Sequence, residues 1–196
     1  QRERLAGTYA DLSDQESYQP ACEFFLAELY GGLDFLKRDQ DLDRVMPVMV
    51  RFLPGNALGS LAEAFELQAI SLEFDIGLSA ILNQRRCTDL DLENYASAYR
   101  EFGDRPGREH QIVLIHRLGI ELGKLVNKSL VSYLVRLLRG PAHAAGFGEL
   151  QQFLESGLAS FRKLEDRQYF IETIYQREWR AMENLFAGDD HPYRLS

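Results

Sequence analysis

Side chains that could do chemistry gather between residues 105 and 116. Arg105 and Arg108 lie at the expected start of a long helix, and His110 and His116 follow within it. Two arginines at a helix N-terminus oppose the helix dipole, and this arrangement becomes favourable when a phosphate or carboxylate binds there. One hypothesis is therefore a small anionic ligand at these residues. The alternative is ordinary surface pairing with the nearby acids Glu101, Asp104 and Glu109.

His116 lies on the apolar face of the helix predicted over residues 108–139. A histidine in such a place can be a core residue whose ring nitrogens are hydrogen-bonded, because buried polar groups must find partners. It can also form a general acid–base pair with a carboxylate, for which Glu66 and Glu73 of the preceding helix are candidates. The sequence leaves both interpretations open.

Neither a metal site nor a cofactor is predicted. The chain has no Glu-x-x-His motif of the kind found in di-iron bundles. His110 and His116 are separated by about 240° around a helix and could not share a metal ion. A haem bound through His116 would fit an all-helical fold, but a single histidine is weak support. Nucleophile-elbow, Walker and dinucleotide glycine motifs are absent from the sequence.

Residues 54–82 predict the helix around which the other elements pack. Its apolar side chains fall at helical spacing into two stripes separated by polar seams. One stripe comprises Leu58, Leu61, Phe65, Ala69, Leu72 and Ile76. The other comprises Leu67, Ile70, Phe74 and Leu78. Two stripes are typical of a helix between two layers of helices, so we expect a buried central helix with both stripes in the core.

The remaining patterns also have helical period, and no strand-period segment of useful length interrupts them. The predicted helices cover residues 2–12, 18–30, 35–52, 90–102, 108–139, 149–164 and 167–186. Gly119 and Gly123 lie one turn apart on one helix face, which predicts close approach of a neighbouring helix. We expect a single all-α domain over residues 1–196, a bundle of about seven or eight helices, with residues 188–196 as a flexible tail.

The composition narrows the class of partner. Twenty-two Lys and Arg residues stand against 30 Asp and Glu residues, a net charge of −8, so attraction to nucleic acid is not expected. No apolar run has the length of a membrane span, so no membrane association is expected. Cys22 and Cys87 match no disulfide or CxxC pattern and are predicted to be reduced structural thiols. A cytoplasmic location is the simplest expectation.

Three groups of residues resemble a family pattern. The first is Phe24-Phe25-Leu26-Ala27-Glu28-Leu29-Tyr30-Gly31, followed by Asp34-Phe35 and Arg38-Asp39. The others are Arg105-Pro106 with Arg108-Glu109, and Leu150-Gln151 with Phe153-Leu154-Glu155 and Phe161-Arg162. Together they resemble an uncharacterised family of all-helical proteobacterial proteins. The resemblance implies a bacterial helical protein and transfers neither an activity nor a site residue.

The sequence favours a binding module over a recognisable enzyme. We expect a protein partner or self-association, with a small anionic ligand as a further hypothesis. The alternative is an enzyme or small-molecule carrier whose interhelical pocket lies near His116. A broad exposed apolar patch would favour the first hypothesis, and a pocket with converging polar groups would favour the second.

Overall fold

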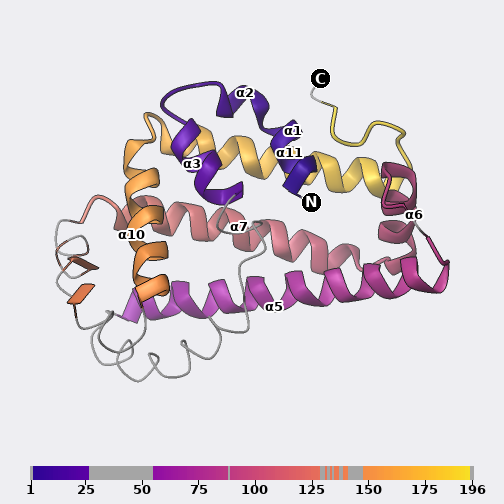
Figure 1. Cartoon of the computed structure of the whole chain (residues 1–196), viewed down its shortest axis with the longest axis horizontal. Coiled ribbons are helices and arrows are strands. Elements are labelled where there is room, and N and C mark those ends of the chain that lie inside the picture. The colour runs from indigo at the N-terminus through magenta and orange to yellow at the C-terminus, as the bar shows by residue number, and fades with distance from the viewer. Residues whose placement is uncertain are drawn as a thin grey trace. The chain divides into compact units, whose positions relative to one another are not determined.

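A computed structural model describes residues 2–26, 55–87, 89–128, 131, 133, 135–136, 139–140 and 148–194. Within these residues the regular secondary structure is helical, which confirms the all-α class (Figure 1). The helices are α1 (Arg2–Thr8), α2 (Ala10–Ser13), α3 (Gln19–Phe24), α5 (Gly55–Gln84), α6 (Leu92–Phe102), α7 (Arg105–Leu125), α10 (Gly148–Lys163) and α11 (Arg167–Ala187). The helix predicted over residues 35–52 lies outside the described residues.

Aspartate side chains begin three of these helices. Asp91, Asp104 and Asp166 accept hydrogen bonds from the backbone N–H groups of Asn94 (2.8 Å), Gly107 (3.0 Å) and Tyr169 (2.8 Å). Such bonds satisfy N–H groups that have no partner within the helix. The start of α11 at Arg167 agrees with the helix predicted over residues 167–186, whereas α7 starts at Arg105 and not at residue 108, because Asp104 is its cap.

The long helix predicted over residues 108–139 is wrong in its extent, since α7 ends at Leu125. The next residue, Val126, is buried. Its carbonyl accepts a hydrogen bond from Nε of Arg162 at 3.4 Å. Carbonyls at a helix end need such partners, and here a side chain of α10 supplies one. The helix predicted over residues 2–12 is likewise divided, at Tyr9, into α1 and α2.

The chain divides into two compact units. Unit 1 comprises residues 1–58 and 120–170, and unit 2 comprises residues 59–119 and 171–196. Both α7 and α11 contribute residues to each unit. The single-domain organisation stays a prediction.

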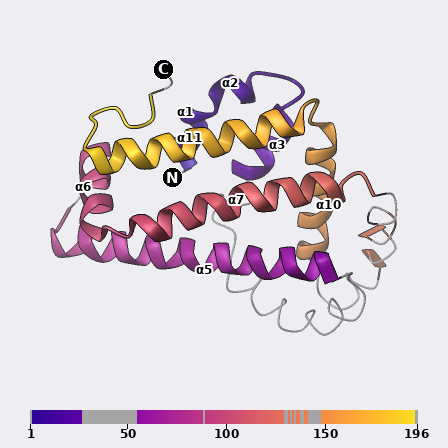
Figure 2. The ribbon, with the colours of Figure 1, turned by 180° about the vertical axis from the view of Figure 1, so that it is seen from behind.

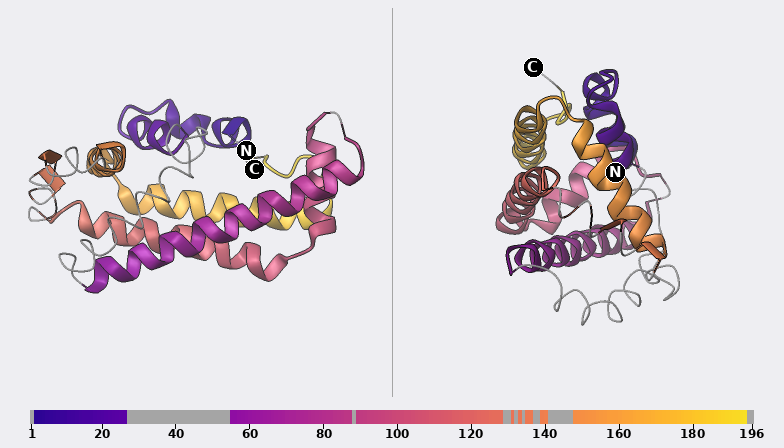
Figure 3. Two further views of the ribbon diagram at one scale, coloured as in Figure 1. Left: turned by 60° about the horizontal axis from the view of Figure 1, so that its bottom comes forward. Right: turned by 90° about the vertical axis from the view of Figure 1, so that its left-hand side faces the viewer.

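Unit 1 has an aromatic core. In this unit α3 packs against α10 and α2 packs against α3 (Figure 3). The ring of Phe24 lies 5.2 Å from that of Phe153, and the Phe25 ring lies 5.8 Å from that of Phe161. Phe170 packs edge-on against Phe161 at 6.2 Å. Phe153 and Phe161, two of the residues that carry the family resemblance, are therefore packing residues.

Polar residues of the same resemblance are also structural. Glu155 of α10 accepts hydrogen bonds at 3.0 Å from Arg139 Nε and from Gln151 Nε2. These bonds hold the pKa of Glu155 below its usual range, and the bond from Arg139 has the larger effect. Gln151 is itself buried and donates to the carbonyl of Val135. The network ties α10 to the segment that precedes it.

Unit 2 is built from α5, α6 and the parts of α7 and α11 that belong to it. Figures 1 and 2 show α5 and α7 running alongside each other, with α6 at the end where they are joined. The buried core residues are Leu78, Ala96, Ala98, Tyr99, Ile112, Met182 and Leu185. Pro192 is also buried, and Tyr193 packs against this core. Residues 188–194, where we predicted a flexible tail, thus contain contacts with the body of the unit.

Helix α5 buries part of one predicted stripe and exposes part of the other. Phe74 and Leu78 are 2% and 5% exposed, whereas Leu72 and Ile76 are 58% and 61% exposed. The expectation that both stripes lie in the core is therefore wrong at Leu72 and Ile76. Helical period identifies the faces of a helix, but it does not say which faces other elements cover.

A glycine on α7 and another on α5 allow close packing in unit 2. A Cβ atom at Gly119 would lie 3.2 Å from two side-chain carbons of Ile171, which confirms the predicted close approach at Gly119. The same expectation for Gly123 stays a prediction. A Cβ atom at Gly77 would overlap the ring of Phe102. That ring packs edge-on against Phe74 at 5.6 Å, so it has little freedom to move away.

Two substitutions on α5 should separate its buried face from its exposed face. Phe74→Ala should cost about 3–5 kcal/mol of unfolding free energy, because it empties a packed site. Leu72→Ala should cost less than about 1 kcal/mol, because it removes an exposed side chain. Urea titrations measure both values. Equal losses in the two variants would contradict the assignment of the exposed face.

Two glycine-to-alanine changes on the same helix should have opposite signs. Gly77→Ala should destabilise the protein by about 1–3 kcal/mol through overlap with Phe102. Gly59→Ala should stabilise it by up to about 1 kcal/mol, since a Cβ atom there meets nothing within 4 Å. Thermal unfolding of both variants tests this. Stabilisation by both changes would mean that Phe102 moves away without cost.

Candidate functional site

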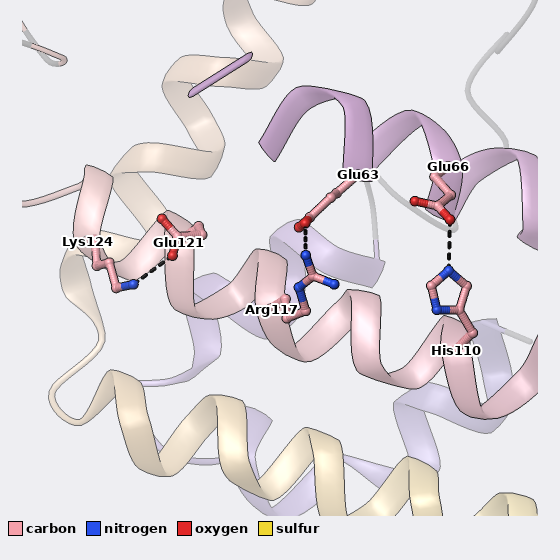
Figure 4. Close-up of polar contacts among 6 residues, drawn as sticks. All are labelled: Glu63, Glu66, His110, Arg117, Glu121 and Lys124. Atoms are coloured by element: carbon pink, nitrogen blue, oxygen red, sulfur yellow. Dashed lines mark hydrogen bonds and ion pairs between the residues drawn. The ribbon is translucent and has the colours of Figure 1, made fainter. Parts of the chain in front are cut away.

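Polar side chains of α7 contact α5 along one side of unit 2 (Figure 4). His110 Nε2 lies 2.8 Å from Glu66 Oε1, and Arg117 pairs with Glu63. Gln111 Nε2 donates to Ser71 Oγ at 2.8 Å. Residues 110 and 117 are close to two full turns apart and therefore share a face of α7.

Glu63 and Glu66 belong to one of the polar seams between the two apolar stripes of α5. Their contacts with α7 give these two polar side chains a structural role. Such half-exposed ion pairs contribute at most about 1 kcal/mol each. Their main effect is to fix how α7 lies along α5. The Lys124–Glu121 pair of Figure 4 is different, because it joins two residues of α7 at 2.6 Å.

His116 pairs with a carboxylate that the sequence analysis did not consider. Its Nε2 lies 3.1 Å from Oε2 of Glu172 on α11, and its ring lies 4.6 Å from that of Tyr175. The proposed partner Glu66 binds His110 instead. His116 thus has a hydrogen-bond partner and an aromatic neighbour, as a core histidine requires. A pairing between residues so distant in sequence leaves no local spacing signal.

Arg108 is a buried cation between two aromatic rings. Its Cζ atom lies 3.8 Å from the ring centre of Phe74 and 4.6 Å from that of Tyr99. Nη1 donates to Oε1 of Gln111 at 3.1 Å. The flat guanidinium group can stack on rings in this way while keeping a hydrogen bond at its edge. Asp75 is exposed, but partial loss of hydration raises the pKa of its carboxyl, and the positive charge of Arg108 opposes that shift.

Arg105 pairs with acidic side chains on two helices. Its Nε donates to Glu109 Oε1 at 2.9 Å, and its Nη2 lies 3.8 Å from Glu183 Oε1. Both arginines of the proposed anion site therefore have protein partners, and an anion would compete with Glu109 for Arg105. The structure does not bring His110 and His116 to these guanidinium groups as a single cluster, since each histidine binds its own glutamate. The anion site stays a prediction.

Cys22 and Cys87 are both free cysteines. Cys22 is buried, and burial raises the pKa of its thiol, as expected of a structural residue.

A surface hollow in unit 2 lies away from the candidate residues. It has a volume of about 420 Å³ and is lined by Leu92, His191, Pro192, Tyr193 and Arg194. None of the four proposed ligand-binding residues lines it.

The described part of the chain contains no group of three or more His, Cys, Asp or Glu side chains placed to hold a metal ion. None of its helices combines the length and apolar character that spanning a membrane would require.

The surface that the sequence analysis assigned to the interior is an exposed apolar row on α5. We call Ala69, Leu72, Ile76 and Ala80 the α5 row; all four are exposed. Their spacing of three and four residues places them on one helix face. Glu73 and Asp75 are also exposed and lie on opposite sides of the row. The predicted stripe that contains Leu72 and Ile76 was the available signal, but a stripe alone does not distinguish core from contact surface.

Arg108→Lys should destabilise the protein more than Arg105→Lys does. Lysine lacks the planar group that lies over Phe74 and Tyr99, so we expect a loss of about 1–2 kcal/mol. The exposed pair at Arg105 should change stability by less than about 0.5 kcal/mol. Urea titrations of the two variants give the comparison. A neutral Arg108→Lys change would mean that any cation suffices between the rings.

Comparison with known proteins gives a family and no function. Searches of curated proteins and of solved structures find no match. A family described as a domain of unknown function, DUF8198, matches residues 1–192. This match covers nearly the whole chain, in agreement with the uncharacterised family expected from the sequence. The chain therefore belongs to the DUF8198 family.

Proposed function

We propose that the protein is a binding module that recognises another protein through the α5 row. The observation that carries the proposal is the exposure of Leu72 and Ile76, at 58% and 61%, on the face of α5 opposite Phe74 and Leu78. Exposed apolar side chains that line up along one helix favour a contact surface over chance exposure.

The size of the row fits one helix as its binding partner. From Ala69 to Ala80 the row spans about 16 Å of helix axis. Burial of a leucine or isoleucine side chain contributes about 1.5–3 kcal/mol, so Leu72 and Ile76 can supply the apolar centre of a contact. The costs of association offset much of this gain. Contacts around the row must therefore add to the affinity.

The alternative is an enzyme or carrier that uses His116. It is supported by the 3.1 Å contact between His116 and Glu172. A general base also needs a substrate within hydrogen-bond reach. The hollow near residues 191–194 contains neither of these two side chains. The α5 row is the better supported surface.

Site-specific crosslinking in the host cell tests the proposal. A photoreactive phenylalanine analogue at Ile76 should give a discrete crosslinked product. The matched control at Gln176, an exposed position on α11, should not. The product should weaken when Leu72→Ser is added to the Ile76 probe. Equal yields at the two positions, or no product at Ile76, would contradict a binding role for the row.

A further inference from the structure

We infer that the partner of the α5 row is an amphipathic helix with lysine or arginine residues beside its apolar side chains. This inference rests on the proposed function and adds the chemistry of the partner. It is carried by the charges around the row, by the absence of an ion pair or hydrogen bond at Glu73 within the described residues, and by the spacing of the row itself.

All the charged residues of helix α5 are acidic. Its 30 residues contain Glu63, Glu66, Glu73 and Asp75 and no lysine or arginine. Glu63 and Glu66 are occupied by Arg117 and His110. Glu73 is exposed, and within the described residues its carboxylate has no ion pair or hydrogen bond. Asp75 interacts with the charge of Arg108, so among the described residues the acid of α5 without a charged partner is Glu73, which follows Leu72.

The two acids beside the row lie where flanking contacts form. At 100° per residue Glu73 and Asp75 are on opposite sides of Leu72. A helix docked along the row would place its own flanking residues near both carboxylates, as in other helix pairs. Lysine or arginine at those positions would form opposite-charge pairs. Such pairs contribute modestly to affinity and strongly to the choice of partner.

Charge also favours a basic helix over a second copy of the chain as the partner. A twofold axis near Phe74 would bring Glu73 of one copy towards Asp75 of the other, since twofold contacts are self-complementary. Two like charges would then meet at the interface, between chains of net charge −8 each. A basic helix replaces this repulsion by attraction.

The spacing of the row favours a helix over an extended strand. Positions 69, 72, 76 and 80 repeat every three or four residues. A docked helix presents side chains at the same period, so several pairs can meet along the contact. A strand presents side chains to one face every second residue and would match fewer of them.

Two designed peptides test the chemistry of the partner. Both are 21-residue amphipathic helices with the same leucine row, one flanked by lysines and the other by glutamates. Fluorescence anisotropy with the full chain at 50 mM NaCl should show the lysine peptide binding about tenfold or more tightly than the glutamate peptide. The difference should shrink at 300 mM NaCl, because salt screens exposed charges.

Variants at exposed positions assign the effect to the row. Glu73→Gln with Asp75→Asn should remove most of the preference for the lysine peptide. Glu93→Gln with Asp190→Asn changes the net charge equally at exposed sites outside α5 and should preserve it. Leu72→Ser with Ile76→Ser should abolish binding of the lysine peptide. Circular dichroism establishes that each variant is folded.

Several outcomes would overturn the inference without overturning the proposed function. Equal binding of the two peptides, or an equal effect of the two charge-changing variants, would remove the role of Glu73 and Asp75. Absence of peptide binding while Ile76 still gives a crosslink would mean that the partner has another chemistry. A crosslinked product of twice the chain mass, with a dimer in sedimentation, would identify a second copy as the partner.

Discussion

The stacking of Arg108 between Phe74 and Tyr99 is the contact on which unit 2 depends. Arginine that is only 9% exposed has lost most of its hydration, and this loss must be offset by its surroundings. The two rings and the side-chain amide oxygen Oε1 of Gln111 contribute to that compensation. Because the rings belong to α5 and α6, this one side chain of α7 holds three helices together. Phe74 lies on the buried face of α5, opposite the exposed row.

Local signals predicted the helices well and their surroundings poorly. The end of α6 at Phe102 and the start of α11 at Arg167 agree with the predicted ranges, because Gly103 with φ 73° and the cap at Asp166 are neighbouring residues. The end of α7 was missed, and the carbonyl that follows it accepts a hydrogen bond from Arg162, far along the chain. The partner of His116 was missed for the same reason. The two stripes of α5 were recognised correctly, but their coverage depends on packing between elements that periodicity does not describe.

Several of the described residues that carry the family resemblance help to hold the fold together. Arg108 stacks on rings, Gln151 and Glu155 bind the segment before α10, and Phe161 fills the core of unit 1. Leu72 and Ile76 lie outside these patterns. A pattern of this kind identifies an architecture, and it leaves the chemistry of the binding surface to be found from exposure and charge. This explains how a chain can match its family over residues 1–192 while the pattern assigns no function.

When no partner is bound, the carboxylate of Glu73, which has no ion pair or hydrogen bond within the described residues, still lies beside the exposed row. An exposed row of leucine and isoleucine would promote association between identical molecules, and acidic residues next to such a row act against it. The same side chains that we assign to partner choice therefore also oppose self-association of the chain through the unoccupied row. Conditions that neutralise or screen these carboxylates, such as acid or concentrated salt, would remove this protection. The chain would then form reversible assemblies through α5 while its helices stay folded.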